Sequence, residues 1–135
     1  MDTTQLRQHL LSCGLRPTRQ RMAIAEALFS GPHRHITPEQ LHRELCAGDT
    51  QTSLATVYNT LNYFLGLSLI RELSVAPGLT CFDTNTDPHM HIYNEQTGEI
   101  TDADAESLGI HVADLRLPEG TTLARIDIVL RVRSA

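Results

Sequence analysis

The spacing of apolar residues changes about halfway along this chain of 135 residues. Before residue 67 they recur at helical spacing, as in Leu54, Val57 and Leu61. In the second half the period becomes two, most clearly over residues 126–133, which is typical of a strand with one buried face. The sequence therefore predicts a helical first half and a β-rich second half, an α+β chain.

Start signals divide the first half into four helices. The first covers residues 3–13, and the second begins with Thr18 as its N-cap. The third begins at Thr37, which is followed by a proline and by a glutamine at the position that closes a capping box. The fourth starts after Thr52 or Ser53. The first half is therefore predicted to be a run of short helices that ends in a longer fourth one.

A hairpin is predicted directly after the fourth helix. Two short strands, residues 69–73 and 79–83, flank Ala76-Pro77-Gly78. Pro-Gly is the preferred pair of a type II turn. Three helices, a longer fourth and a hairpin make up a winged helix-turn-helix, and we expect this domain to cover residues 1–84.

The remaining residues, 85–135, are expected to form a small α/β dimerisation domain. Residues 89–94 and 99–101 are predicted as strands, 103–114 as a short helix or irregular turn, and 126–133 as the last strand. So few elements give too small a core for independent stability. We therefore expect a second copy of the chain to complete this domain.

The charge is distributed unevenly. The formal net charge is −5, but residues 1–80 carry seven Arg against six Asp or Glu, while residues 81–135 carry four against ten. The acidic excess therefore lies in the second half. All 11 basic residues are Arg, whose guanidinium suits bidentate contacts with phosphates and base edges.

Membrane and disulfide-rich classes are not favoured. No apolar run approaches the roughly 18 residues of a membrane span, and the chain does not open with the pattern of a signal peptide. Cys13, Cys46 and Cys81 are odd in number and far apart, which fits neither a disulfide framework nor a zinc knuckle. We expect a cytoplasmic protein with no membrane partner.

The predicted fourth helix has a polar face with the properties of a DNA reader. That face carries Ala55, Thr56, Tyr58, Asn59 and Asn62. Small and amide side chains let a helix enter the major groove and bond base edges, and a tyrosine reaches phosphate or a thymine methyl. Arginines at the entry to the second helix are placed to clamp a DNA backbone: Arg16, Arg19 and Arg21. A polar face is also common on a merely solvated helix, and it is the hairpin that favours DNA binding.

His89 and His91 are candidate metal ligands. In a strand they project to the same side, so they can share one ion while Met90 points into the packing. Imidazoles bind Fe²⁺, Zn²⁺ or Mn²⁺ with carboxylate help. Further donors lie close in sequence or on the loop before the third helix: His33, His35, Asp83, Asp87, Asp102 and Asp104. Two exposed surface histidines are the alternative, which the surrounding donors disfavour.

These segments together resemble the ferric uptake regulators, metal-dependent bacterial repressors with a winged-helix domain and a dimerisation domain. The resemblance covers nearly the whole chain and is carried by residues 14–21, 53–61, 82–83 and 89–91. Within the family, residues 82–86 look closest to the iron response regulator branch, which typically carries three consecutive histidines where this chain has His-Met-His.

The resemblance implies a regulatory metal site built from both domains, with His35, Asp83, His89, His91 and Asp102 as ligands. Ferrous iron is the expected ion, and manganese or zinc can substitute. Metal would then favour the domain orientation in which the recognition helices of a homodimer fit successive major grooves of a pseudo-palindromic operator. The expected DNA contacts are Arg16, Arg19, Ser53, Ala55, Thr56, Tyr58 and Asn59.

Three alternative functions remain open. Two Asp ligands resemble the peroxide repressor, in which ferrous iron oxidises its own histidine ligands. Some iron response regulators are controlled by haem, so haem is an alternative cofactor, with the apo form then binding DNA. A metallohydrolase is the rival from another class, but no oriented base or nucleophile accompanies the ligands. We therefore expect a regulator and not an enzyme.

The chain departs from the family pattern in three places. Where members hold structural zinc with two CxxC pairs, the first pair is replaced by Asn94 and Thr97, so no structural zinc held by four cysteines is expected. Cys13-Gly14 lacks the proline of a Cys-Pro haem motif. A further family metal site uses a histidine of the second domain, and His111 cannot be assigned to it.

Overall fold

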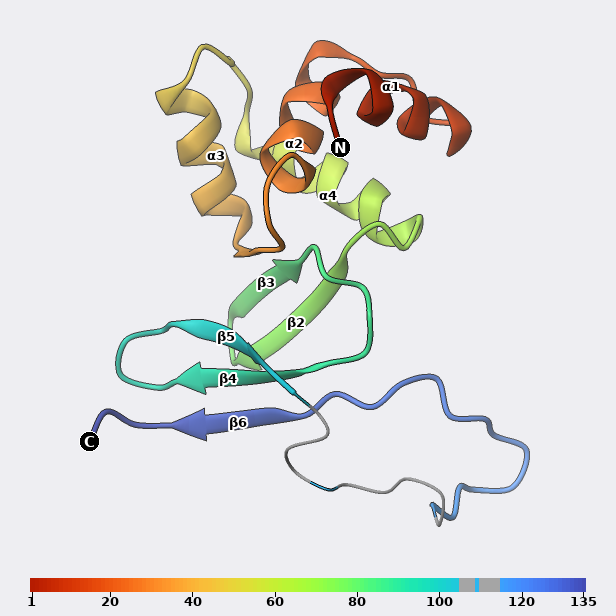
Figure 1. Cartoon of the computed structure of the whole chain (residues 1–135), viewed down its shortest axis with the longest axis vertical. Coiled ribbons are helices and arrows are strands. Elements are labelled where there is room, and N and C mark those ends of the chain that lie inside the picture. The colour runs from red at the N-terminus through yellow and green to blue at the C-terminus, as the bar shows by residue number, and fades with distance from the viewer. Residues whose placement is uncertain (105–108, 110–114) are drawn as a thin grey trace. The chain divides into compact units, whose positions relative to one another are not determined.

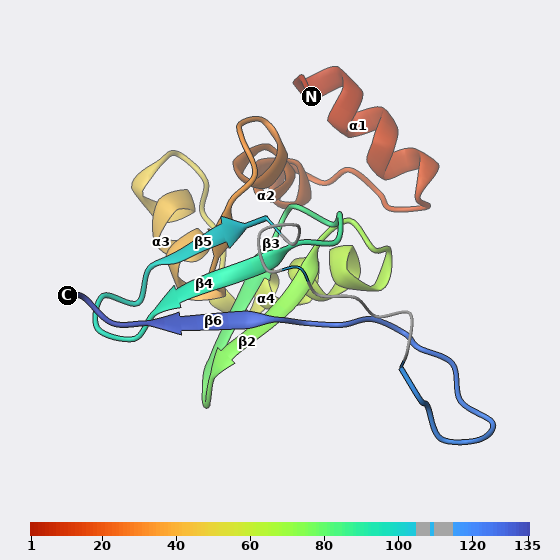
Figure 2. The same ribbon diagram turned by 60° about the horizontal axis from the view of Figure 1, so that its bottom comes forward.

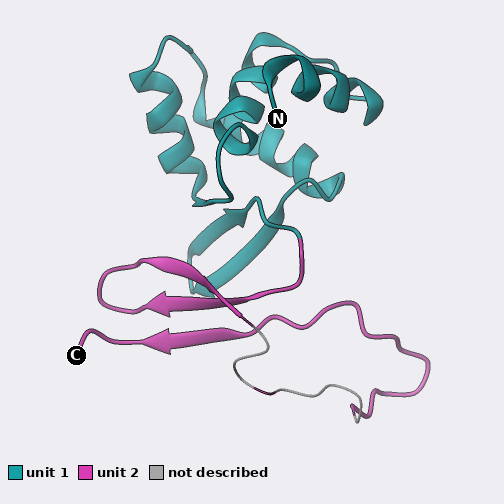
Figure 3. Cartoon of the chain, in the orientation of Figure 1, with its two compact units in different colours: residues 1–86 teal, residues 87–135 magenta. Residues whose placement is uncertain are grey.

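The computed structural model of the chain describes residues 1–104, 109 and 115–135. It contains two compact units, Met1–Thr86 and Asp87–Ala135 (Figure 3), called unit 1 and unit 2 below. Unit 1 combines helices with a three-stranded sheet, whereas the described part of unit 2 contains a second three-stranded sheet. The predicted α+β class is confirmed.

Unit 1 contains four α-helices: α1 (Thr3–Ser12), α2 (Arg19–Phe29), α3 (Pro38–Ala47) and α4 (Leu54–Gly66) (Figure 1). Each begins after a residue whose side chain accepts a hydrogen bond from a backbone N–H of the first turn: Asp2, Thr18, Thr37 and Ser53. Ser53 thus starts α4, the choice that the sequence left open. Within the described residues, no helix is long and apolar enough to span a membrane.

The core of unit 1 is centred on α4. Val57, Leu61 and Phe64 are fully buried on one side of that helix. The Phe64 ring packs against Phe29 of α2, with 5.9 Å between ring centroids. The elements around it contribute aliphatic residues, among them Leu6, Leu10, Ile24, Leu28, Ile36, Leu41 and Ile70. The packing of these residues fixes how α4 is rotated about its own axis, and therefore which of its side chains face outward.

The sheet of unit 1 has the order β1-β3-β2 and is antiparallel. Its strands are β1 (His35–Ile36), β2 (Arg71–Ala76) and β3 (Leu79–Asp83). The hairpin turn contains Gly78 at φ +74°, the left-handed conformation that a type II turn requires. β2 begins two residues later than predicted, because Leu69 and Ile70 pack into the helical core instead. The two-residue β1 was not predicted.

Unit 2 contains β4 (Met90–Asn94), β5 (Ile100–Ala103) and β6 (Val129–Val132), in the order β5-β4-β6 (Figure 2). β5 is antiparallel to β4, whereas β6 is parallel to it. β6 is shorter than the predicted strand 126–133, because it pairs only with His91–Asn94 of the short β4. The helix or turn expected over residues 103–114 lies mostly outside the described residues.

The position of Phe64 predicts a large effect of truncation. Phe64→Ala should lower the free energy of unfolding by about 3–5 kcal/mol, because it removes a fully buried ring and leaves a cavity. Urea unfolding followed by circular dichroism measures the change. Leu11→Ala is the matched control, since Leu11 is 55% exposed and surface truncations stay within about 0.5 kcal/mol. Equal losses in both variants would contradict the packing described.

Candidate functional site

Unit 1 brings one histidine and one carboxylate together. β1 pairs with β3 so that His35 lies opposite Asp83, and the distance from His35 Nε2 to Asp83 Oδ2 is 3.2 Å. Asp83 is only 1% exposed. Its other oxygen, Oδ1, accepts a hydrogen bond of 2.8 Å from the backbone N–H of Asn85. One carboxylate oxygen is therefore held by the backbone while the other is directed at the imidazole.

Arg34 fixes the short strand that carries His35. The backbone N–H of Arg34 donates to Thr84 Oγ1, and the backbone N–H of Thr84 donates to the Arg34 carbonyl. The guanidinium donates to the Ala27 carbonyl of α2 and to both carboxylate oxygens of Glu44 on α3, at 3.0 and 2.6 Å. A two-residue strand would be weakly held alone, and these contacts tie it to two helices and to the end of β3.

Unit 2 gathers the other three predicted ligands. β4 and β5 place His91 opposite Asp102. Asp102 Oδ1 lies 3.2 Å from His89 Nε2 and 3.7 Å from His91 Nε2. The donor atoms of these three residues all lie within 4.8 Å of one another. This spacing suits one ion coordinated by two imidazoles and a carboxylate.

The second ring nitrogen of His89 orients its imidazole. His89 Nδ1 lies 2.6 Å from the backbone carbonyl of Asp87. Because a carbonyl only accepts hydrogen bonds, Nδ1 carries the proton, and in the neutral ring the lone pair is at Nε2, toward Asp102. Metal-ligating histidines are typically held by this kind of outer hydrogen bond. Between the two histidines Met90 is buried, as the alternation predicted.

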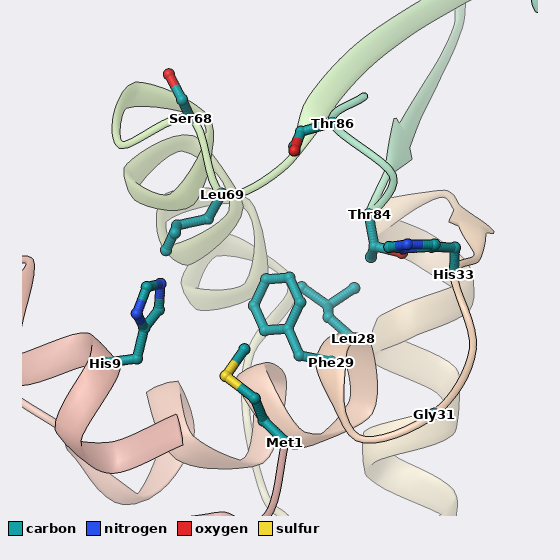
Figure 4. A pocket seen from close by; sticks show the side chains of 10 residues that line it. All are labelled: Met1, His9, Leu28, Phe29, Gly31, His33, Ser68, Leu69, Thr84 and Thr86. Atoms are coloured by element: carbon teal, nitrogen blue, oxygen red, sulfur yellow. The ribbon is translucent and has the colours of Figure 1, made fainter. Parts of the chain in front are cut away.

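His33 lies elsewhere in unit 1. Its Nδ1 is 3.5 Å from Thr84 Oγ1, and it lines a cavity of about 270 Å³ (Figure 4). The other residues around this cavity are Met1, His9, Leu28, Phe29, Gly31, Ser68, Leu69, Thr84 and Thr86. Apart from His33, which the sequence offered as a further donor, none of the residues predicted to bind metal or DNA lines it. Of the two histidines expected on the loop before the third helix, His35 in β1 is thus the one beside Asp83.

Cys81 lies two residues before Asp83 but has the properties of a core thiol. It is 3% exposed. Burial, with a smaller contribution from the Asp83 carboxylate, raises the pKa of the Cys81 thiol to about 11. Since thiolates and not thiols are strong ligands and nucleophiles, Cys81 is poorly suited to either role at neutral pH.

The polar face of α4 is exposed as the DNA-reading prediction requires. Ser53, Ala55 and Asn59 are exposed, and Thr56 and Tyr58 are half-buried. Thr60, which the sequence analysis did not place in the core, is 3% exposed on the opposite side. Because Val57, Leu61 and Phe64 are turned into the core, the small, hydroxyl and amide groups named above lie on the outward side of the helix.

The arginines near α2 have different environments. Arg16 and Arg19 are exposed. The Arg21 guanidinium lies 5.3 Å from the ring centroid of Tyr63 on α4, and its Nη1 donates to the Arg16 carbonyl at 3.0 Å. Arg21 is therefore held against α4, while Arg16 and Arg19 are exposed to solvent.

The sequence analysis did not identify Glu39 as a residue of this surface. The Tyr58 hydroxyl donates a hydrogen bond of 2.6 Å to Glu39 Oε1, in the first turn of α3. The two residues are 19 positions apart, and no periodicity within a single helix connects them. Only the packing of α3 beside α4 brings them together.

The winged helix-turn-helix, the exposed polar helix and the grouped histidine and aspartate donors define a class, the metal-responsive transcription regulators. The sequence model of the ferric uptake regulator family matches residues 12–131. The chain therefore belongs to the ferric uptake regulator family, as the sequence resemblance predicted, and its members are regulators and not enzymes.

Individual relatives agree with this assignment. The chain is 35% identical over 111 residues to the peroxide-responsive repressor PerR of Staphylococcus aureus, covering 78% of this chain and 74% of the repressor. It is 26% identical to the ferric uptake regulator of Pseudomonas aeruginosa solved with manganese, with a TM-score of 0.75 and coverage of 95% and 96%. The Vibrio cholerae regulator shares the fold, with a TM-score of 0.77 at 22% identity and coverage of 95% and 98%.

The burial of Cys81 predicts its reactivity. In the double variant Cys13→Ser/Cys46→Ser, the single remaining thiol should react with a thiol reagent at about pH 8 only after denaturant is added, because Cys81 is buried and protonated. The absorbance of the chromophore that the reagent releases measures the rate of thiol modification. Cys13→Ser/Cys81→Ala is the control, since it leaves the exposed Cys46. Similar rates for the two folded variants would disprove the burial.

Proposed function

We propose that this chain is an iron-responsive repressor that binds a pseudo-palindromic operator as a homodimer. The observation that carries the proposal is the convergence of His89, His91 and Asp102, with Nε2 of His89 fixed toward Asp102 by the contact of Nδ1 with Asp87. Nitrogen and oxygen donors of this kind suit Fe²⁺, Mn²⁺ and Zn²⁺.

We further propose that the His35–Asp83 pair completes the same site. Only the residues 84–88 separate Asp83 from His89, so the chain holds the two ligand groups within about 20 Å at full extension. Each group alone has too few protein donors for a five- or six-coordinate ion. Together they supply three imidazoles and two carboxylates.

A shared site would connect metal binding to DNA binding. When bound, the ion supplies a strong attraction between donors of unit 1 and unit 2, which favours one orientation of the two units over others. His35 is tied through Arg34 to α2 and α3, and α3 packs beside the recognition helix. The ligand is thus part of the rigid body that carries the DNA-reading residues.

The DNA-reading surface that we propose consists of the exposed face of α4 and the arginines before and at the start of α2. Asn59 and the small side chain of Ala55 are suited to the major groove. Ser53, Thr56 and Tyr58 surround them, and Arg16 and Arg19 would contact phosphates or a minor groove. The acidic excess of the chain belongs to residues 81–135, so it does not arise from the residues that form this surface.

The second copy would complete unit 2. A sheet of three strands is only marginally stable on its own. Within the described residues of unit 2, β5 and β6 are the edge strands of such a sheet. Large apolar side chains of this unit are exposed in the single chain: Leu115, Leu117, Leu123, Ile126 and Val132. A homodimer covers such surface, and it also presents two recognition helices to the two halves of an operator.

Operator binding tests the proposal. Duplexes would be selected from a random library by the full-length protein, once with manganese under reducing conditions and once with EDTA. We expect manganese to strengthen binding about tenfold or more, within the usual range of allosteric coupling. His89→Ala/His91→Ala should abolish the response, and His35→Ala should weaken metal affinity.

The exposed His9 on α1 supplies the control variant, His9→Ala, which should behave as the wild type. Equal operator affinity with manganese and EDTA would contradict metal control. Tight binding by the apo protein that haem abolishes would instead identify the haem-controlled alternative. Unchanged metal affinity in His35→Ala would show that the two ligand groups do not share an ion.

A second candidate function is peroxide sensing, favoured by the 35% identity to a peroxide-responsive repressor. With iron present, hydrogen peroxide should add one oxygen atom to an imidazole of His35, His89 or His91, with water as the other product, and operator binding should fall. Mass spectrometry of the corresponding peptides detects the added oxygen. Manganese-loaded protein is the control, and an unmodified chain that retains DNA binding after peroxide treatment with iron would exclude this function.

A further inference from the structure

Two tyrosines of α4 are each held by a charged residue from a neighbouring helix. Tyr63 lies under the Arg21 guanidinium of α2, and Tyr58 donates to the Glu39 carboxylate of α3. A cation beside a DNA-reading helix is expected, because phosphates attract it. An anion at the same surface is not, since it repels the phosphates that supply most non-specific affinity.

Glu39 has an ordinary structural explanation that must be considered first. It lies in the first turn of α3, where a carboxylate is stabilised by the helix dipole. That explanation requires only a negative charge near the helix end. It does not account for the 2.6 Å bond across to Tyr58, since a carboxylate there is equally favourable when it faces water.

The contact with Tyr58 is a charge-assisted hydrogen bond. Its length is typical of a hydroxyl donating to an ionised carboxylate. Donation from Tyr58 lowers the pKa of Glu39, with a weaker contribution from Arg43 one turn along α3. The same bond raises the pKa of the Tyr58 phenol. The Glu39 carboxylate is therefore ionised at neutral pH, and the Tyr58 hydroxyl hydrogen is used in the hydrogen bond to it.

We propose that Glu39 is a specificity-determining residue of the DNA-reading surface: it holds the Tyr58 ring in one orientation and places a negative charge where phosphates approach. This inference rests on the proposed DNA-binding function. A fixed ring loses less conformational entropy when it contacts a base. The charge weakens binding to every sequence, so that a duplex is bound tightly only where the held ring and its neighbours fit the bases.

This assignment also determines how Tyr58 contacts DNA. Because its proton is donated to Glu39, the phenol has no hydrogen left to donate to a phosphate oxygen. The ring therefore contributes an apolar edge, suited to a thymine methyl, or accepts a hydrogen bond at its oxygen. Of the two contacts that a tyrosine here can make, phosphate bonding is the disfavoured one.

Two conservative variants separate the charge from the hydrogen bond. Glu39→Gln removes the charge but keeps an acceptor for Tyr58. Glu39→Asp keeps the charge and the favourable interaction with the helix end, but its side chain is one methylene shorter and falls short of the phenol. Tyr58→Phe removes the bond from the other side. Glu99→Gln, an exposed acid in unit 2, is the matched control for loss of one negative charge.

The full-length proteins would be titrated with the selected operator and with a scrambled duplex over a range of salt concentrations. Glu39→Gln should bind the scrambled duplex severalfold more tightly. The dependence of this affinity on salt concentration should become steeper, by up to about one released counterion for each half-site. Glu39→Asp and Tyr58→Phe should leave scrambled binding unchanged and weaken operator binding on the order of fivefold or more, the low end of a base contact. Combining these two changes should have no additional effect.

The hydrogen bond itself is tested without DNA. In protein labelled at the tyrosine ring carbons, NMR titration should show Tyr58 ionising at a higher pH than it does in Glu39→Asp. The proposal would be overturned if both Glu39 variants kept the wild-type salt dependence and the wild-type ratio of operator affinity to scrambled-duplex affinity. If Tyr58→Ala weakened operator binding in the same experiment, the DNA-binding function would stand without the role of Glu39. If no duplex is selected by the wild-type protein, DNA binding itself fails.

Discussion

The contacts of Arg34 hold the functional part of unit 1 together. Its backbone joins the end of β3 through Thr84, and its guanidinium joins the last turns of α2 to Glu44 of α3. His35, the next residue, therefore belongs to a strand that is anchored on three sides. Without this anchor, a two-residue strand would have little reason to stay paired with β3, and His35 would not be kept beside Asp83.

The two halves of the proposed metal site are built in the same way from different local structures. Each uses an antiparallel register to place a histidine opposite an aspartate: His35 opposite Asp83 in one unit and His91 opposite Asp102 in the other. A strand pair fixes the Cα separation of facing residues, so the geometry of each half is set by backbone hydrogen bonds. The ligands are thus preorganised within each unit.

Much of the fold follows from local chemistry that can be identified in the sequence. N-caps such as Thr18, Thr37 and Ser53 act within one helical turn, and the Pro-Gly turn acts within four residues, so these elements were predicted with nearly correct starts. The strands were predicted less well, since the limits of a strand depend on its partner. β6 ends its pairing where β4 ends, and β2 begins only after Ile70 has entered the helical core.

The parts of the site that sequence reasoning missed depend either on packing between distant residues or on the local direction of the backbone. The two residues of β1 show no strand pattern in the sequence, because β1 is defined only by its pairing with β3. The bond between Glu39 and Tyr58 joins two helices, and the hydrogen bond that sets the tautomer of His89 depends on the backbone direction at Asp87. The alternation of His89, Met90 and His91 was enough to predict a shared side for the two imidazoles, but not the orientation of either ring.

The parallel pairing of β4 with β6 makes unit 2 unequally stable. β5 follows β4 through a short hairpin, whereas more than thirty residues separate β4 from β6, and the entropic cost of closing a loop rises with its length. We therefore expect local opening of unit 2 to release β6 before β5. The backbone N–H of His91 donates to Ile128 beside β6, so amide exchange at His91 reports this opening. A ligand of the proposed metal site thus draws part of its rigidity from the most distant segment of the unit.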